Sequence, residues 1–266
     1  MLLSELNVYP IKSLKGVALS ESVIEKRGLE HDRRWVLVDA NNRFISQREH
    51  AELARVQVSI NQAGLQVDSE GRESLIVPAR PTKDLPVTVQ IWKDTCGGLL
   101  VGKEADEWFS DVIGESCRLV FMPDDSKRVV DPEYAVGAAI VSFADAYPYM
   151  LLTEGSLDDL NKRLEQPVSM NRFRPNFVVN AAEPFAEDNW KLIRIGSVDF
   201  HVVKPCARCV MTTVDQERGV RNGDEPLRTL SSYRKRGTQV HFGQNLIAAA
   251  EGGTVRVGDQ VTVSHK

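Results

Sequence analysis

Several features that would define a protein class are missing from this 266-residue chain. It has only four cysteines, too few and too scattered to suggest a disulfide scaffold. Its net charge of −4 argues against a dedicated nucleic-acid binder, which is normally basic. No apolar run approaches the roughly 18–20 residues that cross a bilayer, and the first residues lack the pattern of a signal peptide. We therefore expect a cytoplasmic protein with reduced thiols, whose partners include neither nucleic acid nor membrane.

What is present is a series of short β-like runs broken by turn residues. They predict strands at 16–26, 34–39, 85–92, 176–180, 192–203 and 254–263, the last with a turn at 258–259, and several of these runs alternate apolar and polar residues. Helices are predicted at 104–113, from a capping box at 156–159, and at 224–234 with Pro226 in its first turn. Many strands with scattered helices predict a mainly β, α+β protein of barrels decorated by helices. A polar, proline-flanked stretch at 122–132 divides the chain into predicted, closely packed domains 1–122 and 123–266.

The sharpest local feature is a pair of cysteines, Cys206 and Cys209, in the segment 204–209 (KPCARC). A thioredoxin-like redox pair would begin a helix, but the β-branched run 210–214 predicts a strand. A zinc site would need a second close pair of Cys or His ligands, and none stands at the usual spacing. Two further interpretations of the cysteine pair remain open. One is a single thiolate ligand for a cofactor metal, favoured by the neighbouring Lys204 and Arg208, and the other is two buried thiols without chemistry.

Cationic and amide side chains recur in five other short segments: YPIKS at 9–13, DRRW at 32–35, SQR at 46–48, NRFRPN at 171–176 and FGQN at 242–245. An arginine fork binds phosphate through two hydrogen bonds, and a lysine binds it as a point charge. Arg172 and Arg174 lie two residues apart, so on a strand they would share one face. The spacing fits either a phosphate clamp or a solvated sheet edge.

Together, these segments resemble a known family. YPIKS, SFADAYPYMLL, NRFRPNFVV, IRIGSVDFHVVKPCARC followed by TTVD, EPLRTLSSYR and FGQNL occur in the order found in MOSC-domain proteins, from about residue 2 to 263. The resemblance is to the branch that contains the mitochondrial amidoxime-reducing component and the bacterial YcbX proteins. It implies a MOSC β-barrel domain packed against an N-terminal MOSC-type β-barrel domain, with a molybdenum cofactor between them.

The resemblance also implies which residues form the site. The second cysteine of the family's CxRC motif ligates molybdenum, and it corresponds here to Cys209. The implied anchors of the pterin and its phosphate are Lys12, Ser13, Arg33, Asp145, Arg174, Asn176, Arg208 and Asn245. The match is looser beside Asp145, because Ala146 and Tyr147 replace small hydroxyl residues. Glu183 stands where some relatives carry an aspartate near the metal, which makes it a candidate catalytic proton donor alongside Cys209.

The activity implied by the resemblance is that of a molybdenum-dependent oxidoreductase reducing N-hydroxylated compounds such as hydroxylamines, amidoximes and N-hydroxylated base analogues. YcbX-type proteins commonly carry a C-terminal ferredoxin domain, whose C-x₄-C-x₂-C run does not occur here, so no iron–sulfur cluster is expected in this chain. Either a separate ferredoxin-, flavin- or cytochrome-type protein donates electrons, or the sequence is part of a longer chain. Two alternatives are a molybdenum-cofactor or sulfur carrier without turnover, and a binding module in which Cys209 is a core thiol.

Overall fold

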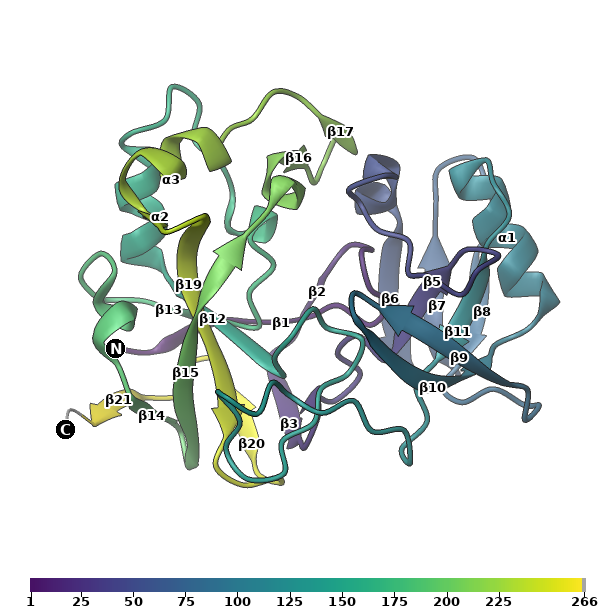
Figure 1. Ribbon diagram of the computed structural model, residues 1–266, viewed down its shortest axis with the longest axis horizontal. Helices are drawn as coiled ribbons and strands as arrows, with labels where there is room; N and C mark the ends of the chain where they lie inside the picture. The colour runs from purple at the N-terminus through teal and green to yellow at the C-terminus, as the bar shows by residue number, and fades with distance from the viewer. Residues whose placement is uncertain (265–266) are drawn as a thin grey trace.

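Short strands dominate residues 1–264, the part of the chain that the computed structural model describes. They form two lobes that lie side by side, with both termini in the lobe drawn mainly in green and yellow (Figure 1). The fold is mainly β with few helices, as the sequence predicts. No helix in the described residues is both long and apolar enough to cross a membrane.

The larger lobe is built on a nine-stranded sheet. Its strands, in spatial order, are β2 (Val17–Ala18), β1 (Leu3–Val8), β13 (Phe177–Val179), β12 (Tyr149–Thr153), β19 (Gln239–Ala248), β15 (Val198–Arg208), β14 (Leu192–Ile195) and β21 (Val261–Ser264), and β18 (Lys235–Arg236) pairs with β19 beside this path. Tyr149, Phe177 and Phe200 pack against one another in its core, with ring centroids 5.2–5.7 Å apart. These rings lie on β12, β13 and β15 and hold the central strands of the sheet together.

The smaller lobe consists of two short sheets and one amphipathic helix. Its strands are β5 (Trp35–Val38), β11 (Arg118–Phe121), β10 (Asp94–Leu100) and β9 (Pro86–Ile91) in one sheet, and β6 (Gln57–Asn61), β7 (Gly64–Asp68) and β8 (Leu75–Pro78) in the other. Helix α1 (Lys103–Ile113) buries Ala105, Phe109 and Ile113 against this core. It ends at Gly114, whose φ of 73° is the left-handed conformation that glycine adopts most easily.

The remaining elements connect the lobes and cover their ends. They are the strands β3 (Glu21–Glu25), β4 (Gly28–Leu29) and β20 (Thr254–Arg256) in one sheet, β16 (Val214–Asp215) and β17 (Val220–Arg221) in another, the helices α2 (Glu154–Asn161) and α3 (Leu227–Tyr233), and the 3-10 helices η1 (Ala51–Arg55), η2 (Met170–Arg172), η3 (Ala186–Asn189) and η4 (Val210–Thr213). Strand β1 pairs with β13, and β3 pairs with β20, so the start of the chain joins the C-terminal half before it enters the smaller lobe. The division at residue 122 stays a prediction.

One prediction near the cationic segments is wrong, and one conditional expectation does not apply. Residues 210–213 form the 3-10 helix η4 and not a strand, because Thr212 and Thr213 donate their hydroxyls to the carbonyls three residues earlier. Arg172 and Arg174 do not share a strand face. Arg172 ends η2, and Arg174 follows in the left-handed region with a φ of 54°.

Two helices and one turn also differ from the expected details. Helix α2 is capped by Thr153, whose hydroxyl accepts a hydrogen bond from the Ser156 backbone N–H, so the cap lies three residues before the predicted capping box. Ser156 does not cap the helix, because its hydroxyl donates to the buried Glu187 carboxylate. Helix α3 begins only after Pro226. Strands β20 and β21 flank the predicted turn but pair with β3 and β14 and not with each other.

Candidate functional site

A cavity of about 320 Å³ lies where loops from both halves of the chain meet. Strands β15 and β19 bring the KPCARC segment to its wall through two irregularities in their pairing, at Val202/Lys204 and Pro205/Ala207. The structure thereby gathers, from segments far apart in the sequence, all nine residues predicted to bind the cofactor: Lys12, Ser13, Arg33, Asp145, Arg174, Asn176, Arg208, Cys209 and Asn245.

The cavity wall is strongly cationic, although the chain as a whole carries a net charge of −4. The seven basic side chains on it are Lys12, Arg33, Arg48, Arg172, Arg174, Lys204 and Arg208. Asp145 is the one carboxylate among the lining residues that the structure describes. Such a local excess of positive charge concentrates anions, so the cavity suits a ligand that carries phosphate or thiolate groups.

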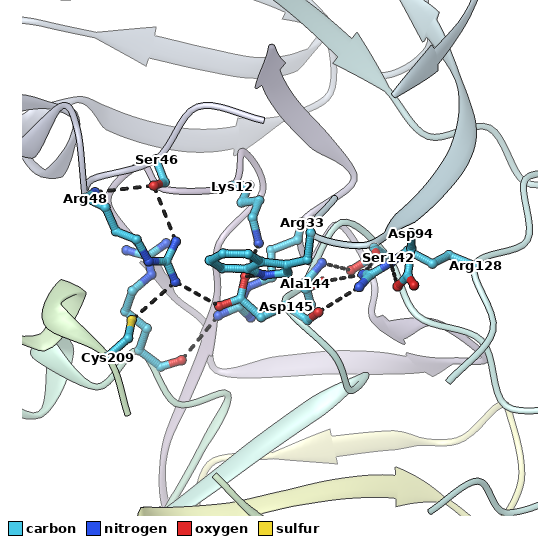
Figure 2. Close-up of polar contacts among 12 residues, drawn as sticks. Lys12, Arg33, Ser46, Arg48, Asp94, Arg128, Ser142, Ala144, Asp145 and Cys209 are labelled. Atoms are coloured by element: carbon cyan, nitrogen blue, oxygen red, sulfur yellow. Dashed lines mark hydrogen bonds and ion pairs between the residues drawn. The ribbon is translucent and has the colours of Figure 1, made fainter. Parts of the chain in front are cut away.

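Arg48 joins the cysteine to the acidic residue (Figure 2). Its Nη2 donates to Cys209 Sγ at 3.2 Å and to Asp145 Oδ2 at 3.4 Å. Its guanidinium also lies 4.5 Å from the ring centroid of Trp92. The contact places a positive charge directly against the Cys209 sulfur. The sequence identifies Arg48 as one basic residue in the SQR segment, but it does not reveal that Arg48 contacts Cys209, which lies 161 residues later in the chain.

Asp145 and Lys12 form a second link across the cavity. Lys12 Nζ lies 2.5 Å from Asp145 Oδ1, and Trp92 Nε1 donates to the same oxygen at 3.2 Å. Burial lowers the pKa of Lys12 to about 8, against the attraction of Asp145. The surrounding protein partly desolvates Asp145, which alone would raise its pKa, but Lys12 and Arg48 hold that pKa well below its usual range. The side chain of Asp145, 53% exposed, opens onto the cavity, so a bound ligand would meet an ionised carboxylate there.

Arg128 holds the loop that carries Asp145 (Figure 2). Its Nη1 donates to the carbonyls of Ser142, at 3.1 Å, and Ala144, and its Nη2 donates to the Asp145 carbonyl at 2.7 Å. Its Nε bonds Asp94 Oδ2 at 2.9 Å. Three hydrogen bonds from one buried guanidinium fix the backbone of this loop, and the fourth ties Arg128 to Asp94, so the Asp145 side chain is presented in one place.

Two guanidinium groups lie over the ring of Tyr9. The distances to its centroid are 4.3 Å from Arg33 and 4.1 Å from Arg174. Arg33 is paired with the fully buried Asp32 at 2.6 Å, whereas Arg174 has no carboxylate partner among its contacts in the described residues. Burial, with the nearby Arg33 adding repulsion, lowers the pKa of Arg174 to about 10. The wall thus holds a buried cation that the surrounding protein leaves largely uncompensated.

Unsatisfied donors point to a missing ligand. Ser13 Oγ and Arg174 Nη2 are buried and have no hydrogen-bond partner within residues 1–264. Ser13, Arg33 and Arg174 also adopt left-handed φ angles of 72°, 50° and 54°, which are costly for residues other than glycine. Buried donors without acceptors and strained backbone commonly occur together at binding sites, where a ligand supplies the missing acceptors.

Comparison with known proteins identifies the family. The family description "MOSC N-terminal beta barrel domain" matches residues 1–116, and "MOSC domain" matches residues 139–262. Mitochondrial amidoxime-reducing component 1 of Mus musculus is 34% identical over 279 residues, covering 97% of this chain and 81% of the relative. The chain belongs to the MOSC-domain family. Mitochondrial amidoxime reducing component 2 of Rattus norvegicus is 32% identical, and the match covers 97% of this chain and 82% of the relative. Mitochondrial amidoxime-reducing component 1 of Homo sapiens is 30% identical, and the match covers 97% of this chain and 81% of the relative. The predicted family and its two-barrel fold class are confirmed.

Two of the residues that line the cavity use their side chains to bind backbone groups of the protein. Asn176 donates through Nδ2 to the Asn7 carbonyl at 3.1 Å, and its Oδ1 accepts from the Met150 backbone N–H at 3.2 Å. Arg208 donates to the carbonyls of Phe242, at 2.8 Å, and Phe173, at 2.9 Å. These two side chains position the strands around Cys209, whereas Ser13 and Arg174 offer free donors.

The structure does not bring Glu183 into the cavity. Glu183 is exposed in the turn before η3, where its carbonyl accepts a hydrogen bond from the Ala186 backbone N–H at 3.1 Å. The chain turns away here because Ala182 packs closely against Gly155 at the start of α2. The geometry therefore gives no support to Glu183 as a proton donor beside Cys209.

Cys206 lines the same cavity as Cys209. Burial raises the pKa of the Cys206 thiol, although Arg208 opposes the shift. Within the described residues, no group of three or more His, Cys, Asp or Glu side chains is arranged to hold a metal ion. Cys206 and Cys209 are the two thiols that line this cavity.

Proposed function

We propose that this protein is a molybdenum-cofactor-dependent reductase of N-hydroxylated compounds that receives electrons from a separate donor protein. The observation that carries the proposal is the position of the Cys209 thiol. It lies on the wall of a cationic cavity whose buried Ser13 hydroxyl and Arg174 guanidinium lack acceptors. The relatives named amidoxime-reducing components, which align along 97% of this chain, support the same reading.

The residues present fit an anionic pterin cofactor. Thiolate is a soft ligand suited to a metal already held by sulfur. Of the two cavity cysteines, Cys209 is the proposed protein ligand to molybdenum, because it is the second cysteine of the family's CxRC motif. Ser13 and Arg174 would supply hydrogen bonds to the phosphate, and Lys12 and Arg33 would add charge on the same side of the cavity. Arg208 and Asn176 would keep the walls in place through their bonds to backbone groups.

When bound, the cofactor supplies the two-electron chemistry that removes oxygen from an N–OH group, yielding the reduced nitrogen compound and water. The chain's own residues prepare the site for it. Arg48 holds the Cys209 sulfur through a charge-assisted hydrogen bond. Arg128 fixes the loop of Asp145, so that Arg48 and Lys12 keep their orientation toward the cavity.

The test is to measure molybdenum and pterin content and reductase activity in the wild type, Cys209→Ser and Cys206→Ser. Benzamidoxime is the substrate, and dithionite-reduced methyl viologen replaces the donor protein. We expect stoichiometric molybdenum and many turnovers in the wild type, loss of both in Cys209→Ser, and retention of molybdenum in Cys206→Ser. A wild type that carries molybdenum but never exceeds one turnover would support a carrier and overturn the proposal. So would the absence of molybdenum after expression in a cofactor-sufficient host.

A further inference from the structure

Next to the cofactor cavity lies a second cavity, of about 650 Å³, which no predicted site residue lines. Its walls come entirely from residues 39–115, in the N-terminal half of the chain. The two cavities share Arg48, whose guanidinium reaches Cys209 in one and the ring of Trp92 in the other. The second cavity is therefore one side chain away from the proposed metal ligand, and its volume is in the usual range for small-molecule sites.

Two aromatic rings form part of its wall. Phe44 and Trp92 meet edge to face with centroids 4.9 Å apart, and Trp92 is 46% exposed. Trp92 has a φ of 57°, a costly conformation for a large side chain, at the turn between β9 and β10. Its ring is fixed by the Nε1 hydrogen bond to Asp145 and by the Arg48 guanidinium. The fold thus holds an exposed aromatic face rigidly at the edge of the cofactor cavity.

The charges of this cavity differ from those of its neighbour. Acidic and basic side chains are balanced on its wall: Asp39, Glu49 and Glu115 stand against Arg43, Arg48 and Lys93. Such a wall gives no advantage to phosphate or any other strongly anionic ligand. Exposed aromatic rings attract flat, uncharged π-systems, which stack on them at little entropic cost.

Building on the proposed function, we propose that the cavity lined by Phe44, Arg48 and Trp92 is the substrate subsite, which binds the planar ring of an uncharged aromatic N-hydroxylated compound. Aromatic amidoximes and N-hydroxylated base analogues have this shape, whereas hydroxylamine itself does not. The ring would rest on Trp92, and the N–OH group would extend past Arg48 toward Cys209. Trp92 acts as a specificity residue in this arrangement.

The experiment compares benzamidoxime with hydroxylamine in the wild type, Trp92→Phe, Trp92→Leu and Trp108→Phe, with rates expressed per bound molybdenum. Trp92→Phe keeps an aromatic face but loses the hydrogen bond to Asp145, whereas Trp92→Leu loses both. Trp108, on α1, donates to the Glu73 carbonyl away from both cavities and is the matched control. We expect the ratio of kcat/KM for benzamidoxime to that for hydroxylamine to fall about tenfold in Trp92→Leu and to stay near the wild-type value in the other two variants.

Equal losses of that ratio in Trp92→Phe and Trp92→Leu would show that the tryptophan only positions Asp145, and would overturn the subsite. A direct readout is saturation-transfer NMR, in which the benzamidoxime ring protons should receive magnetisation from the wild type and Trp92→Phe but much less from Trp92→Leu. If the wild type binds benzamidoxime in this Trp92-dependent way but reduces neither compound, the proposed function fails and the subsite stands. If it reduces both and Trp92→Leu leaves the ratio and the binding unchanged, the subsite fails and the function stands.

Discussion

Replacing Arg174 with methionine should stabilise the cofactor-free protein and weaken its hold on the cofactor. Arg174 is a buried cation whose contacts are the ring of Tyr9 and the repelling charge of Arg33. One of its terminal nitrogens has no hydrogen-bond partner in the described residues. Methionine keeps most of the stem's packing and removes only the charge and its donors.

The structure sets the size of both effects. Burial and Arg33 lower the pKa of Arg174 from 12.5 to about 10, and one pKa unit corresponds to about 1.36 kcal/mol, so the charge costs folding roughly 3 kcal/mol. The contact with Tyr9 returns about 0.5–2 kcal/mol of that. We therefore expect the unfolding free energy of the cofactor-free protein to rise by about 1–2.5 kcal/mol. Loss of a charge-assisted hydrogen bond, worth about 1.5–3 kcal/mol, should weaken cofactor binding roughly 10- to 150-fold.

The assay is urea unfolding of the cofactor-free protein, together with the molybdenum and pterin content after purification. Arg163→Met is the matched control, because Arg163 lies 4.3 Å from the ring of Tyr233 but is about half exposed, so its removal should change both quantities little. A fall of more than about 1 kcal/mol in the unfolding free energy of Arg174→Met, with cofactor content unchanged, would refute the reasoning and make Arg174 a structural residue.

Three further predictions concern titration and packing. Burial lowers the pKa of Lys12 from 10.5 to about 8 in the folded chain, so between about pH 8 and 10.5 the unfolded chain binds one proton more than the folded chain. The unfolding free energy should therefore rise with pH across this range. Urea titrations at several pH values should show that rise in the wild type and its loss in Lys12→Met. Burial raises the pKa of Glu187 despite hydrogen bonds from Ser156 and Thr153, so the stability of the wild type should fall as the pH rises above the ordinary pKa range of glutamate. Thermal melts should show that Glu187→Gln is more stable than the wild type at neutral pH but not at acid pH. An equal difference in melting temperature at both pH values would contradict this. A Cβ on Gly155 would lie 2.3 Å from the Ala182 carbonyl oxygen, so Gly155→Ala should cost about 1–3 kcal/mol in chemical denaturation, whereas Gly97→Ala, which meets only Ser126 Oγ at 4.0 Å, should cost much less.

Patterns that repeat along the chain could be predicted from the sequence. The continuous apolar run within 34–39 predicts β5, which is buried along its whole length. The alternation at 85–92 predicts β9, and the amphipathic run at 104–113 predicts α1 to within one residue, because burial of one face sets these two periodicities. Motifs in a fixed order indicate the family and its fold, which the relative at 34% identity and the two matching domain descriptions confirm, whereas the cofactor roles of individual residues stay predictions. These patterns depend on neighbouring residues or on the order of segments along the chain, so they can be recognised from the sequence alone.

What the sequence missed depends on contacts between distant segments. The run after Cys209 favours a strand by its β-branched residues, yet Thr212 and Thr213 satisfy nearby carbonyls and turn it into η4. Arg48 is one of many arginines until the fold places it 3.2 Å from Cys209. Glu183 was placed near the metal by analogy, but the packing of Ala182 against Gly155 directs it to the surface.

The same contacts explain why the site lies between two lobes. Lys12 and Arg48 come from the N-terminal half and Cys209 from the C-terminal sheet, and Asp145, in the connecting loop, bonds both basic residues. Without a ligand, this arrangement leaves buried donors unsatisfied at Ser13 and Arg174, and three residues in strained conformations. An anion that fills the cavity would satisfy those donors and bridge both halves at once, so its binding energy would also hold the lobes together. Cofactor loading should therefore raise the melting temperature of both lobes as one transition, and separate transitions in the loaded protein would show that the lobes are not coupled through this site.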